Sequence, residues 1–459
     1  MHRANENVIR ILGAASDQQK GNMCKILIVG GGYAGFYAAW KLEKELRRGE
    51  AHVTVIDRRP YMTYQPFLPE VMAGSIEPRH SVVSLRRHLR RTEVVAGMVI
   101  AINHANKTVT VRPSIGPDFD FSYDIIVVTA GVVTRKFPIA GIAERAIGLK
   151  HIEEAIAIRN RLLASFDEAS NLPEGPKRKR LLTATFVGGG FAGVEGFGEL
   201  LSLATALLRF YPKLRFDELD FRLVQAQARI LPEVSDEIAA RVVRSLEQRG
   251  SRIHLNTQTL SIADGHVVLS NGEEFDSNII VWTTGNAANP VVAKHTDLPI
   301  DERGFLVVRP DLRVGTAMTP VPDAWGAGDD AAIEDLSVNV PGVRTVPNAQ
   351  HAVRQGKRLA ANLVATMRGK PTKNYIHKNL GVVATLGIGH GVFQSGRMAV
   401  TGFPAWLMHR GYHVLAIPTW ERKIRVLVVW LTALCFGRDI ASLEAAHRPR
   451  AAFVSGGER

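Results

Sequence analysis

Two glycine-rich turns with the same spacing are the residues best suited to do chemistry in this sequence. Gly30, Gly32 and Gly35 follow a short β-branched run and precede a pattern typical of a helix. In such a GxGxxG turn the first glycine allows a tight bend, the second lets the backbone approach a pyrophosphate, and the third lets helix and strand pack closely. Asp57 ends the next apolar run, where a carboxylate accepts hydrogen bonds from ribose hydroxyls. This segment predicts a dinucleotide site.

The same turn returns 158 residues later, at Gly188, Gly190 and Gly193, so the chain holds two copies of one nucleotide-binding unit. The second copy has no acid at the end of its next strand, where Gln225 stands instead. A neutral amide still bonds ribose hydroxyls, and it does not repel a 2′-phosphate as a carboxylate does. Gln225 therefore either admits or favours NADPH, or only weakens the choice between NADH and NADPH. Two arginines stand nearby in the sequence, Arg222 and Arg229.

Further glycines follow other expected strands. A Thr-x-Gly segment ends at Gly131 in the first half and at Gly285 in the second, and the pair Gly328-Asp329 follows a third strand. Alone, a Gly-Asp pair predicts only a turn. After two dinucleotide units it suits the ribityl or phosphate region of a flavin dinucleotide, with Asp329 as the hydrogen-bonding partner.

The elements that position these turns follow from hydrophobic patterning. Each half reads strand, glycine turn, helix, strand, which is the βαβ unit of a parallel sheet. The expected strands cover residues 25–29, 52–56, 106–111, 123–128, 182–187, 221–224 and 277–282. Helices are expected over residues 36–46, over 193–207 and from Pro347 onward, with a loop at 172–180. The prediction is an α/β fold with two Rossmann-like dinucleotide-binding domains.

Composition excludes several classes of protein. Lys and Arg exceed Asp and Glu by 57 − 44 = 13, which favours an anionic partner such as nucleic acid, anionic lipid or a phosphate-bearing ligand. The basic runs at 86–91 and 177–180 lack interleaved aromatic residues, so we expect no nucleic-acid site. Cys24 and Cys435 are the only cysteines, which excludes a disulfide-stapled fold, a four-cysteine metal site and a C-x-x-C dithiol. No metal is expected.

The C-terminal region places aromatic and basic side chains beside a short apolar run. That run, residues 426–436, is too short to span a bilayer, which needs about 20 residues. The aromatic and basic residues in and around it are Trp406, Tyr412, Trp420, Arg422, Lys423, Arg425, Trp430, Phe436 and Arg438. They predict a segment that lies in a membrane interface, with a dimerisation or core helix as the alternative.

The sequence resembles the two-dinucleotide-binding-domain flavoproteins and, among them, the type II NAD(P)H:quinone dehydrogenases. The segment Ala349-Gln350-His351-Ala352-Val353-Arg354-Gln355 matches the AQxAxQ quinone-site motif of that family. Glu195, in GGGFAGVEGFGEL, matches the glutamate after the family's second glycine turn, and residues 61–79 resemble its flavin-proximal loop. The resemblance extends from about residue 24 to about residue 443.

The resemblance implies noncovalent FAD in the first unit, NADH or NADPH in the second, and hydride transfer from nicotinamide to flavin N5. The flavin then reduces a membrane quinone of a respiratory chain without proton pumping. The catalytic residues implied are Glu195, Gln350, Gln355 and Lys378, with Ala349 and Gln350 at a helix start that faces the flavin. The family also implies a homodimer, peripheral at the cytoplasmic face of the cell membrane.

The expected domains are a flexible leader (1–23), a discontinuous FAD-binding domain (24–145 and 305–375), an NAD(P)H-binding domain (146–304) and a membrane-associating region (376–459). Two other functions stay open: a soluble NAD(P)H-dependent reductase of another acceptor, and a non-catalytic flavin redox sensor at the membrane. A sulfide:quinone reductase is rejected because its chemistry needs cysteines near the flavin.

Overall fold

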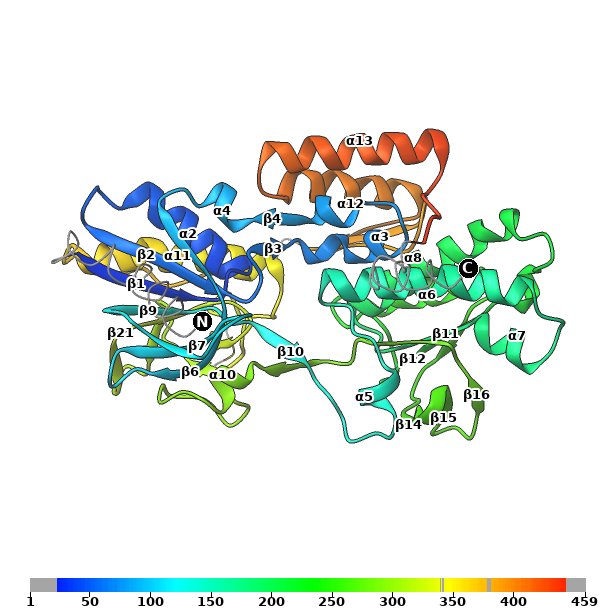
Figure 1. Cartoon of the computed structure of the whole chain (residues 1–459), viewed down its shortest axis with the longest axis horizontal. Helices are drawn as coiled ribbons and strands as arrows, with labels where there is room; N and C mark the ends of the chain where they lie inside the picture. Colours follow the sequence, from blue (N-terminus) through cyan, green and yellow to red (C-terminus); the bar gives the residue numbers. More distant parts are fainter. Residues whose placement is uncertain (1–22, 339, 341, 378–380, 443–459) are drawn as a thin grey trace, which may run out of the picture. The chain divides into compact units, whose positions relative to one another are not determined.

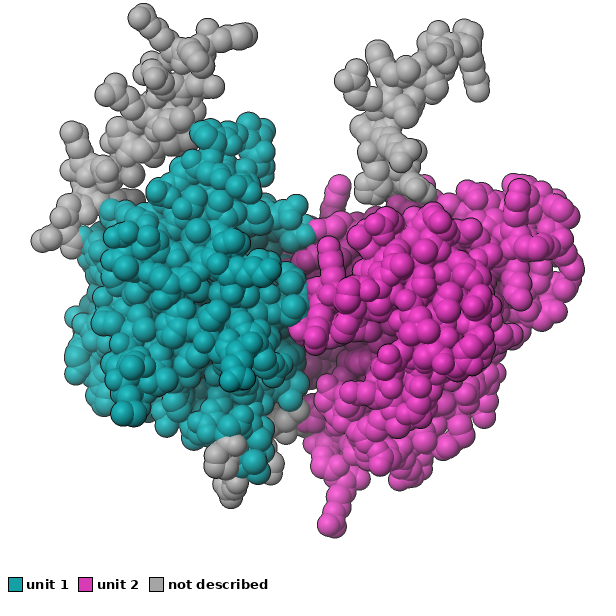
Figure 2. Space-filling view, turned by 90° about the horizontal axis from the view of Figure 1, so that it is seen from below, with its two compact units in different colours: residues 1–62, 84–133, 287–378 teal, residues 63–83, 134–286, 379–459 magenta. Residues whose placement is uncertain are grey.

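The chain alternates between two units (Figure 2). The computed structural model describes residues 23–338, 340, 342–377 and 381–442. Unit 1 consists of residues 1–62, 84–133 and 287–378, and unit 2 of residues 63–83, 134–286 and 379–459. Four passages between them fall within short strands, namely β3 (Tyr61–Thr63), β4 (Val82–Ser84), β10 (Val132–Thr134) and β18 (Asn286–Ala288). Residues 1–22 of the expected leader lie outside the described residues.

Unit 1 is built on a six-stranded sheet with the strand order β20-β21-β9-β1-β2-β5. Neighbouring strands are parallel except β20 and β21, which are antiparallel. The strands are β1 (Cys24–Val29), β2 (Ala51–Asp57), β5 (Thr92–Ala96), β9 (Ile125–Val128), β20 (Arg313–Gly315) and β21 (Pro320–Gly326). All of β9 is buried, as the continuous apolar strands of a covered parallel sheet require.

Two helices of unit 1, α2 (Tyr33–Glu45) and α11 (Ala349–Met367), pack against each other (Figure 1). They approach closely at Gly356, where a Cβ would lie 2.3 Å from the carbonyl oxygen of Ala34. The first turn of α2 therefore lies directly against α11. The remaining elements of unit 1 are α4 (Leu85–His88), β6 (Met98–Asn103), β7 (Thr108–Arg112), β8 (Phe119–Ser122), α10 (Pro290–Ala293), β19 (Leu306–Val307) and β22 (Ala331–Ala332).

Unit 2 repeats the same arrangement around a four-stranded parallel sheet with the order β13-β12-β11-β17. Its strands are β11 (Thr183–Val187), β12 (Asp220–Val224), β13 (Arg252–His254) and β17 (Ile279–Trp282). Val187 pairs with Val224 on one side and with Trp282 on the other. In unit 1, Val29 likewise ends a strand that pairs with β2 and with β9. The duplicated α/β fold is thus confirmed.

Helices and a second small sheet complete the first part of unit 2. They are α3 (Leu68–Met72), α5 (Ile142–Arg145), α6 (Ile152–Ser170), α7 (Pro176–Leu181), α8 (Phe191–Leu207), α9 (Asp236–Glu247), β14 (Thr259–Ser261), β15 (His266–Leu269) and β16 (Glu274–Asp276). Among the described residues, one helical run, Phe191–Phe210, is long and apolar enough to cross a membrane. It comprises α8 and the turn after it and is 67% buried, which is typical of a core helix.

The C-terminal residues of unit 2 form an antiparallel sheet and two helices. These are β23 (Val382–Thr385), β24 (Gly391–Ser395), β25 (Met398–Thr401), α12 (Phe403–Ala416) and α13 (Trp420–Phe436). Trp406, Val426 and Trp430 are buried, so both helices are part of the core of unit 2. The region from 376 onward was expected as a separate part, and its described residues 381–442 cluster with unit 2.

The other expected boundaries and one expected loop also differ from the structure. Residues 134–145 belong to unit 2 because Ala140 bridges to Ser261, and residues 287–304 belong to unit 1 because Thr296 bridges to Ile102. The loop expected at 172–180 is wrong from Pro176 onward. There the proline starts α7, and Arg178 fixes the helix through an ion pair of 2.7 Å with Glu218.

Candidate functional site

The first glycine turn, between β1 and α2, has the geometry of a phosphate cradle. Gly30 has a φ of +96°, and its Cβ would lie 2.3 Å from the carbonyl oxygen of Thr129. A Cβ on Gly35 would lie 1.9 Å from the carbonyl oxygen of Gly30. A Cβ on Gly32 would meet no atom of the described residues within 4 Å. The fold therefore requires the first and third glycines, whereas the second faces open space.

The start of α2 offers its N–H groups to that space. Gly32 is the N-cap residue, and no side chain of the described residues caps the helix, so its first N–H groups have no intrahelical acceptor. Asp57, at the end of β2, accepts hydrogen bonds from the amide N–H groups of Gly31 (2.6 Å) and Arg59 (2.7 Å). These bonds fix the carboxylate of Asp57 beside the turn.

The second glycine turn, between β11 and α8, has the same geometry. Gly188 has a φ of +117°, and its Cβ would lie 2.7 Å from Oγ1 of Thr283. A Cβ on Gly193 would lie 2.0 Å from the carbonyl oxygen of Gly188, whereas one on Gly190 would meet no atom within 4 Å in the part of the chain that the structure describes. Gly190 is also the N-cap of α8. Each unit thus has an open helix start at its second glycine.

The Thr-x-Gly segments hold these turns in place. Oγ1 of Thr129 donates to the carbonyl oxygen of the leading glycine of the first turn at 2.9 Å, and Oγ1 of Thr283 does the same in the second turn at 3.2 Å. The segments end at Gly131 and Gly285, with φ of +68° and +67°. No atom of a described residue lies within 4 Å of a Cβ at either glycine, so both leave room beside a turn.

Gln225 occupies in unit 2 the place that Asp57 occupies in unit 1. Its Oε1 accepts a hydrogen bond from the amide N–H of Gly189 at 2.9 Å, and its Nε2 donates to the carbonyl oxygen of Arg229 at 3.2 Å. The amide replaces the acid without changing the bond to the turn. The difference between the two sites is therefore one of charge rather than of backbone geometry.

The two arginines near Gln225 in sequence are engaged elsewhere. Arg222 is buried in an ion pair with Asp220 at 2.9 Å and covers the ring of Phe275. Arg229 pairs with Asp236 and donates to backbone carbonyl groups. Neither guanidinium is free to bind a 2′-phosphate in this arrangement.

The turn after β21 contains two adjacent carboxylates. Gly328 has a φ of +95°, and Asp329 is half-buried. Asp330, which the sequence analysis missed, is fully buried, and its Oδ2 accepts a hydrogen bond from the amide N–H of Ala130 at 2.6 Å. No donor among the described residues reaches its Oδ1. Burial raises the pKa of Asp330 to about 7. The signal available in the sequence was the second aspartate of the Gly-Asp-Asp run.

Gln355, the last residue of the AQxAxQ segment, has an internal role. Its side chain is buried, and Oε1 accepts a hydrogen bond from the amide N–H of Gly328 at 3.0 Å. Its Nε2 donates to Oγ1 of Thr345 at 3.2 Å. Both ends of the amide are thus used to hold the turn after β21 against α11, and Gln355 does not lie on one surface with Gln350.

The start of α11 is another helix N-terminus in unit 1. Asn348 caps it by accepting a hydrogen bond at the third helical residue. The N–H groups of Ala349 and Gln350, which precede that residue, have no intrahelical acceptor. Oε1 of Gln350 lies 3.5 Å from Nε2 of His377. Lys378, the fourth expected catalytic residue, lies outside the described residues.

Glu195 lies in the second turn of α8 within unit 2. Its side chain is 11% exposed, and its Oε1 accepts a hydrogen bond from the amide N–H of Thr385 at 3.1 Å. Nε2 of His409, on α12, lies 3.5 Å from the same oxygen. Glu195 is therefore not a solvated helix-start acid but the edge of a buried polar cluster.

The two C-terminal helices have an exposed apolar face. On α13 it consists of Ile424, Leu427, Val428, Leu431 and Leu434, and on α12 of Phe403, Leu407 and Leu415. Their spacing of three and four residues places those on α13 along one side of the helix, opposite the buried Val426 and Trp430. This apolar face is what an interfacial helix presents to lipid.

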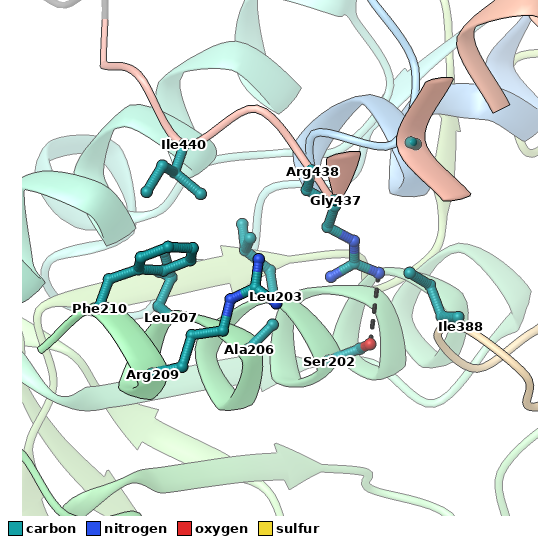
Figure 3. Close-up of a pocket in the computed structure, with 11 residues that line it drawn as sticks. Ser202, Leu203, Ala206, Leu207, Arg209, Phe210, Ile388, Gly437, Arg438 and Ile440 are labelled. Carbon is teal, nitrogen blue, oxygen red and sulfur yellow. Dashed lines mark hydrogen bonds between the residues drawn. The ribbon is translucent and has the colours of Figure 1, made fainter. Parts of the chain in front are cut away.

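Unit 2 also contains a pocket of about 270 Å³ at the end of α13 (Figure 3). Its walls include Leu203, Leu207 and Phe210, with the side chains of Arg209 and Arg438 beside them. None of the expected site residues that the structure describes lines this pocket.

Comparisons with known proteins agree with this geometry. The family described as pyridine nucleotide-disulphide oxidoreductase matches residues 24–356. A probable NADH dehydrogenase of Dictyostelium discoideum is 27% identical over 91% of both chains. A type II NADH:quinone oxidoreductase of Mycobacterium tuberculosis is 27% identical over 88% of this chain and 87% of its own. The structure of NDH2 from Plasmodium falciparum in complex with NADH has a TM-score of 0.82 at 17% identity, covering 92% of this chain and 100% of that one.

Proposed function

Since the chain belongs to the pyridine nucleotide-disulphide oxidoreductase family, we propose that it is a type II NAD(P)H:quinone oxidoreductase that reduces quinone without pumping protons. The observation that carries this proposal is the pair of open, uncapped helix starts at Gly32 and Gly190, one in each unit. Relatives with the name NADH dehydrogenase or type II NADH:quinone oxidoreductase match about nine-tenths of the chain.

FAD fits the residues of unit 1. The open space at Gly32 accepts a pyrophosphate on the N–H groups of α2, and the fixed carboxylate of Asp57 accepts hydrogen bonds from ribose hydroxyls. Asp329, half-buried after Gly328, is the partner for the ribityl or phosphate region. The buried Oδ1 of Asp330, which no described donor reaches, supports the presence of a further group at this turn.

The nicotinamide nucleotide fits the residues of unit 2. Its pyrophosphate has the open helix start at Gly190, and its adenosine ribose has the amide of Gln225. Because Gln225 carries no charge, it does not exclude NADPH. Because Arg222 and Arg229 form ion pairs elsewhere, neither guanidinium stabilises the 2′-phosphate of NADPH. We therefore propose that NADH is a good donor and that NADPH is tolerated.

The electron acceptor is a lipid-soluble quinone rather than a disulfide or sulfide. Cys24 lies in β1 and Cys435 in α13, where it is exposed. Neither cysteine follows a glycine turn or neighbours the other in sequence, so no dithiol is available. The apolar face of α12 and α13 supports attachment to a membrane, where such a quinone dissolves. Peripheral attachment at the cytoplasmic face and a homodimer remain part of this proposal.

The residues of the chain position the reactants and handle charge and protons. When bound, FAD accepts a hydride from the nicotinamide and passes two electrons to the quinone. The start of α11, at Ala349 and Gln350, stabilises negative charge that develops near it through its free N–H groups and dipole. The amide of Gln350 donates to a quinone carbonyl, and Glu195 delivers a proton. Gln355 acts indirectly, because it holds the turn at Gly328.

The test is a steady-state assay that crosses NADH and NADPH with ubiquinone and menaquinone analogues, combined with rapid mixing of the oxidised protein with each nucleotide. We expect the flavin absorbance to bleach with NADH and to recover on addition of quinone. A colourless protein that takes up no flavin would overturn the proposal.

The same experiment decides between the two other functions. Bleaching by NADH without recovery on quinone would favour a soluble reductase of another acceptor. Bound flavin that neither nucleotide bleaches within seconds would favour a redox sensor.

A further inference from the structure

A fully buried histidine in unit 2 lies between two carboxylates. His409, on α12, is 0% exposed. Its Nε2 lies 3.5 Å from Oε1 of Glu195 on α8, and its Nδ1 lies 3.9 Å from Oε1 of Glu70 on α3. Neither ring nitrogen has a hydrogen-bond partner among the described residues. The ring is thus not held by a hydrogen bond to any described residue, which is unusual for a buried polar group.

Glu70, the inner carboxylate, is held at one oxygen and left open at the other. Its Oε2 accepts hydrogen bonds from Nε1 of Trp430 at 2.8 Å and from Nη2 of Arg410 at 3.2 Å. Its Oε1, which faces His409, receives no hydrogen bond from the described residues. Burial raises the pKa of Glu70, so this carboxylate takes up a proton more readily than an exposed one.

The other charged groups around His409 are already engaged. Glu199, also on α8, pairs with Arg438 at 3.0 Å and accepts a hydrogen bond from Oγ1 of Thr385 at 2.6 Å. Arg438 also bonds Ser202 (Figure 3). The guanidinium of Arg249 donates to the carbonyl oxygens of residues 198 and 386.

His413, one turn from His409 on α12, completes the set of neighbouring titratable groups. Its Nδ1 lies 2.9 Å from the hydroxyl of Tyr64, and burial holds its pKa well below the usual value. His413 therefore stays neutral and has a partner. By contrast, the ring nitrogens of His409 and Oε1 of Glu70 have no hydrogen-bond partner among the described residues, and Oε1 of Glu195 lies next to the same ring.

We infer that Glu70, His409 and Glu195 share a proton and resupply Glu195 during quinone reduction. This inference rests on the proposed function. Conversion of NADH and quinone to NAD⁺ and quinol takes up one proton from solvent. Glu195, the partly exposed member, gives that proton to a quinone oxygen and becomes a carboxylate.

Resupply of Glu195 balances without any further reactant. Nε2–H of His409 passes its proton to Glu195, while Nδ1 of the same ring takes the proton of the Glu70 carboxylic acid. Glu195 is then protonated again, His409 is the other neutral tautomer, and Glu70 is a carboxylate next to Arg410 and Trp430. A proton from solvent then binds Nε2 of His409, and Nδ1 of the resulting imidazolium returns its proton to Glu70, so that both groups regain their starting forms.

The first test observes the shared proton without turnover. The six tryptophans are replaced by 5-fluorotryptophan in the flavin-loaded protein, and W430F assigns the fluorine resonance of Trp430. Because Trp430 donates to Glu70, we expect its resonance to titrate with the carboxyl group of Glu70, at a higher pH than an exposed glutamate does. E70Q keeps an acceptor for the indole but cannot ionise, so the titration should vanish. H409Q should move its midpoint, and H413Q should not.

A resonance of Trp430 that does not titrate, or that titrates in E70Q as in the unaltered protein, would overturn the inference.

The second test measures the two half-reactions, flavin reduction by NADH and flavin reoxidation by quinone, separately. We expect H409Q to reduce the rate of flavin reoxidation by quinone at least about tenfold, while the bleaching by NADH stays unchanged. H413Q, a matched buried histidine without a carboxylate in contact, should reoxidise normally.

Equal reoxidation rates in H409Q and the unaltered protein would overturn the relay and leave the proposed function intact. Failure of the unaltered protein to react with NADH or quinone would instead overturn the proposed function, whatever the titration of Trp430 gives.

Discussion

Replacing Gly190 by alanine should separate nucleotide binding from folding. Gly190 has a φ of −75° and its Cβ would meet no atom of the described residues within 4 Å, so alanine fits and should stabilise the protein by about 0.4–1 kcal/mol by lowering the entropy of the unfolded chain. The added methyl group occupies the space in which the N–H groups at the start of α8 approach the pyrophosphate. Loss of one charge-assisted hydrogen bond costs about 1.5–3 kcal/mol, which corresponds to an increase of about 10- to 100-fold in the Kd for NADH.

The assay measures flavin bleaching at increasing NADH concentration in G190A, together with the flavin spectrum and thermal unfolding. The matched control is G193A, whose Cβ would lie 2.0 Å from the carbonyl oxygen of Gly188. We expect G193A to lose about 1–3 kcal/mol of stability. If G190A binds NADH as tightly as the unaltered protein, no pyrophosphate approaches this helix start and the reasoning is refuted.

Three further predictions concern charge and the apolar face. Q225E should raise the preference for NADH over NADPH about tenfold in kcat/KM, because a carboxylate repels the 2′-phosphate; an unchanged ratio would contradict this role. Burial raises the pKa of Asp330 from 3.8 to about 7. Its stabilising contribution is therefore present below about pH 4 and is lost as the pH rises through about 7, by at most about 4 kcal/mol. D330N should accordingly gain thermal stability over the unaltered protein at about pH 8 but not at about pH 5; an equal difference at both would refute the cause given. Glutamate at both Leu431 and Leu434, which are 62% and 67% exposed, should abolish sedimentation with anionic vesicles while flavin binding persists; continued sedimentation would exclude this face as the anchor.

The duplicated turns could be predicted from the sequence because the requirement for glycine is local. Gly30 is needed for the positive φ of the turn and Gly35 for its contact with the carbonyl oxygen of Gly30, both within one βαβ unit, and the GxGxxG spacing is visible in the sequence. The same reasoning located Gln225, since the end of the strand after a helix always lies beside the turn.

The polar cluster could not be predicted, because its members come from distant segments. Glu70 and His409 are 339 residues apart in the sequence, and neither lies in a motif that specifies the other. For Gln355 the motif was visible in the sequence, but the orientation of its side chain was not. The motif indicated a ligand site, but whether its amide faces a ligand or the turn at Gly328 depends on packing between α11 and that turn. The C-terminal helices were expected at a membrane interface, yet their buried tryptophans also complete unit 2.

The alternation of the chain between its two units constrains the order of events during synthesis on the ribosome. The sheet of unit 1 stays incomplete until β21 emerges to pair with β9, and unit 2 lacks part of its core until Trp430 has been made. Apolar surface on most of the chain therefore stays exposed until its last hundred or so residues have been made. Newly made chains should depend on chaperones until they are released from the ribosome.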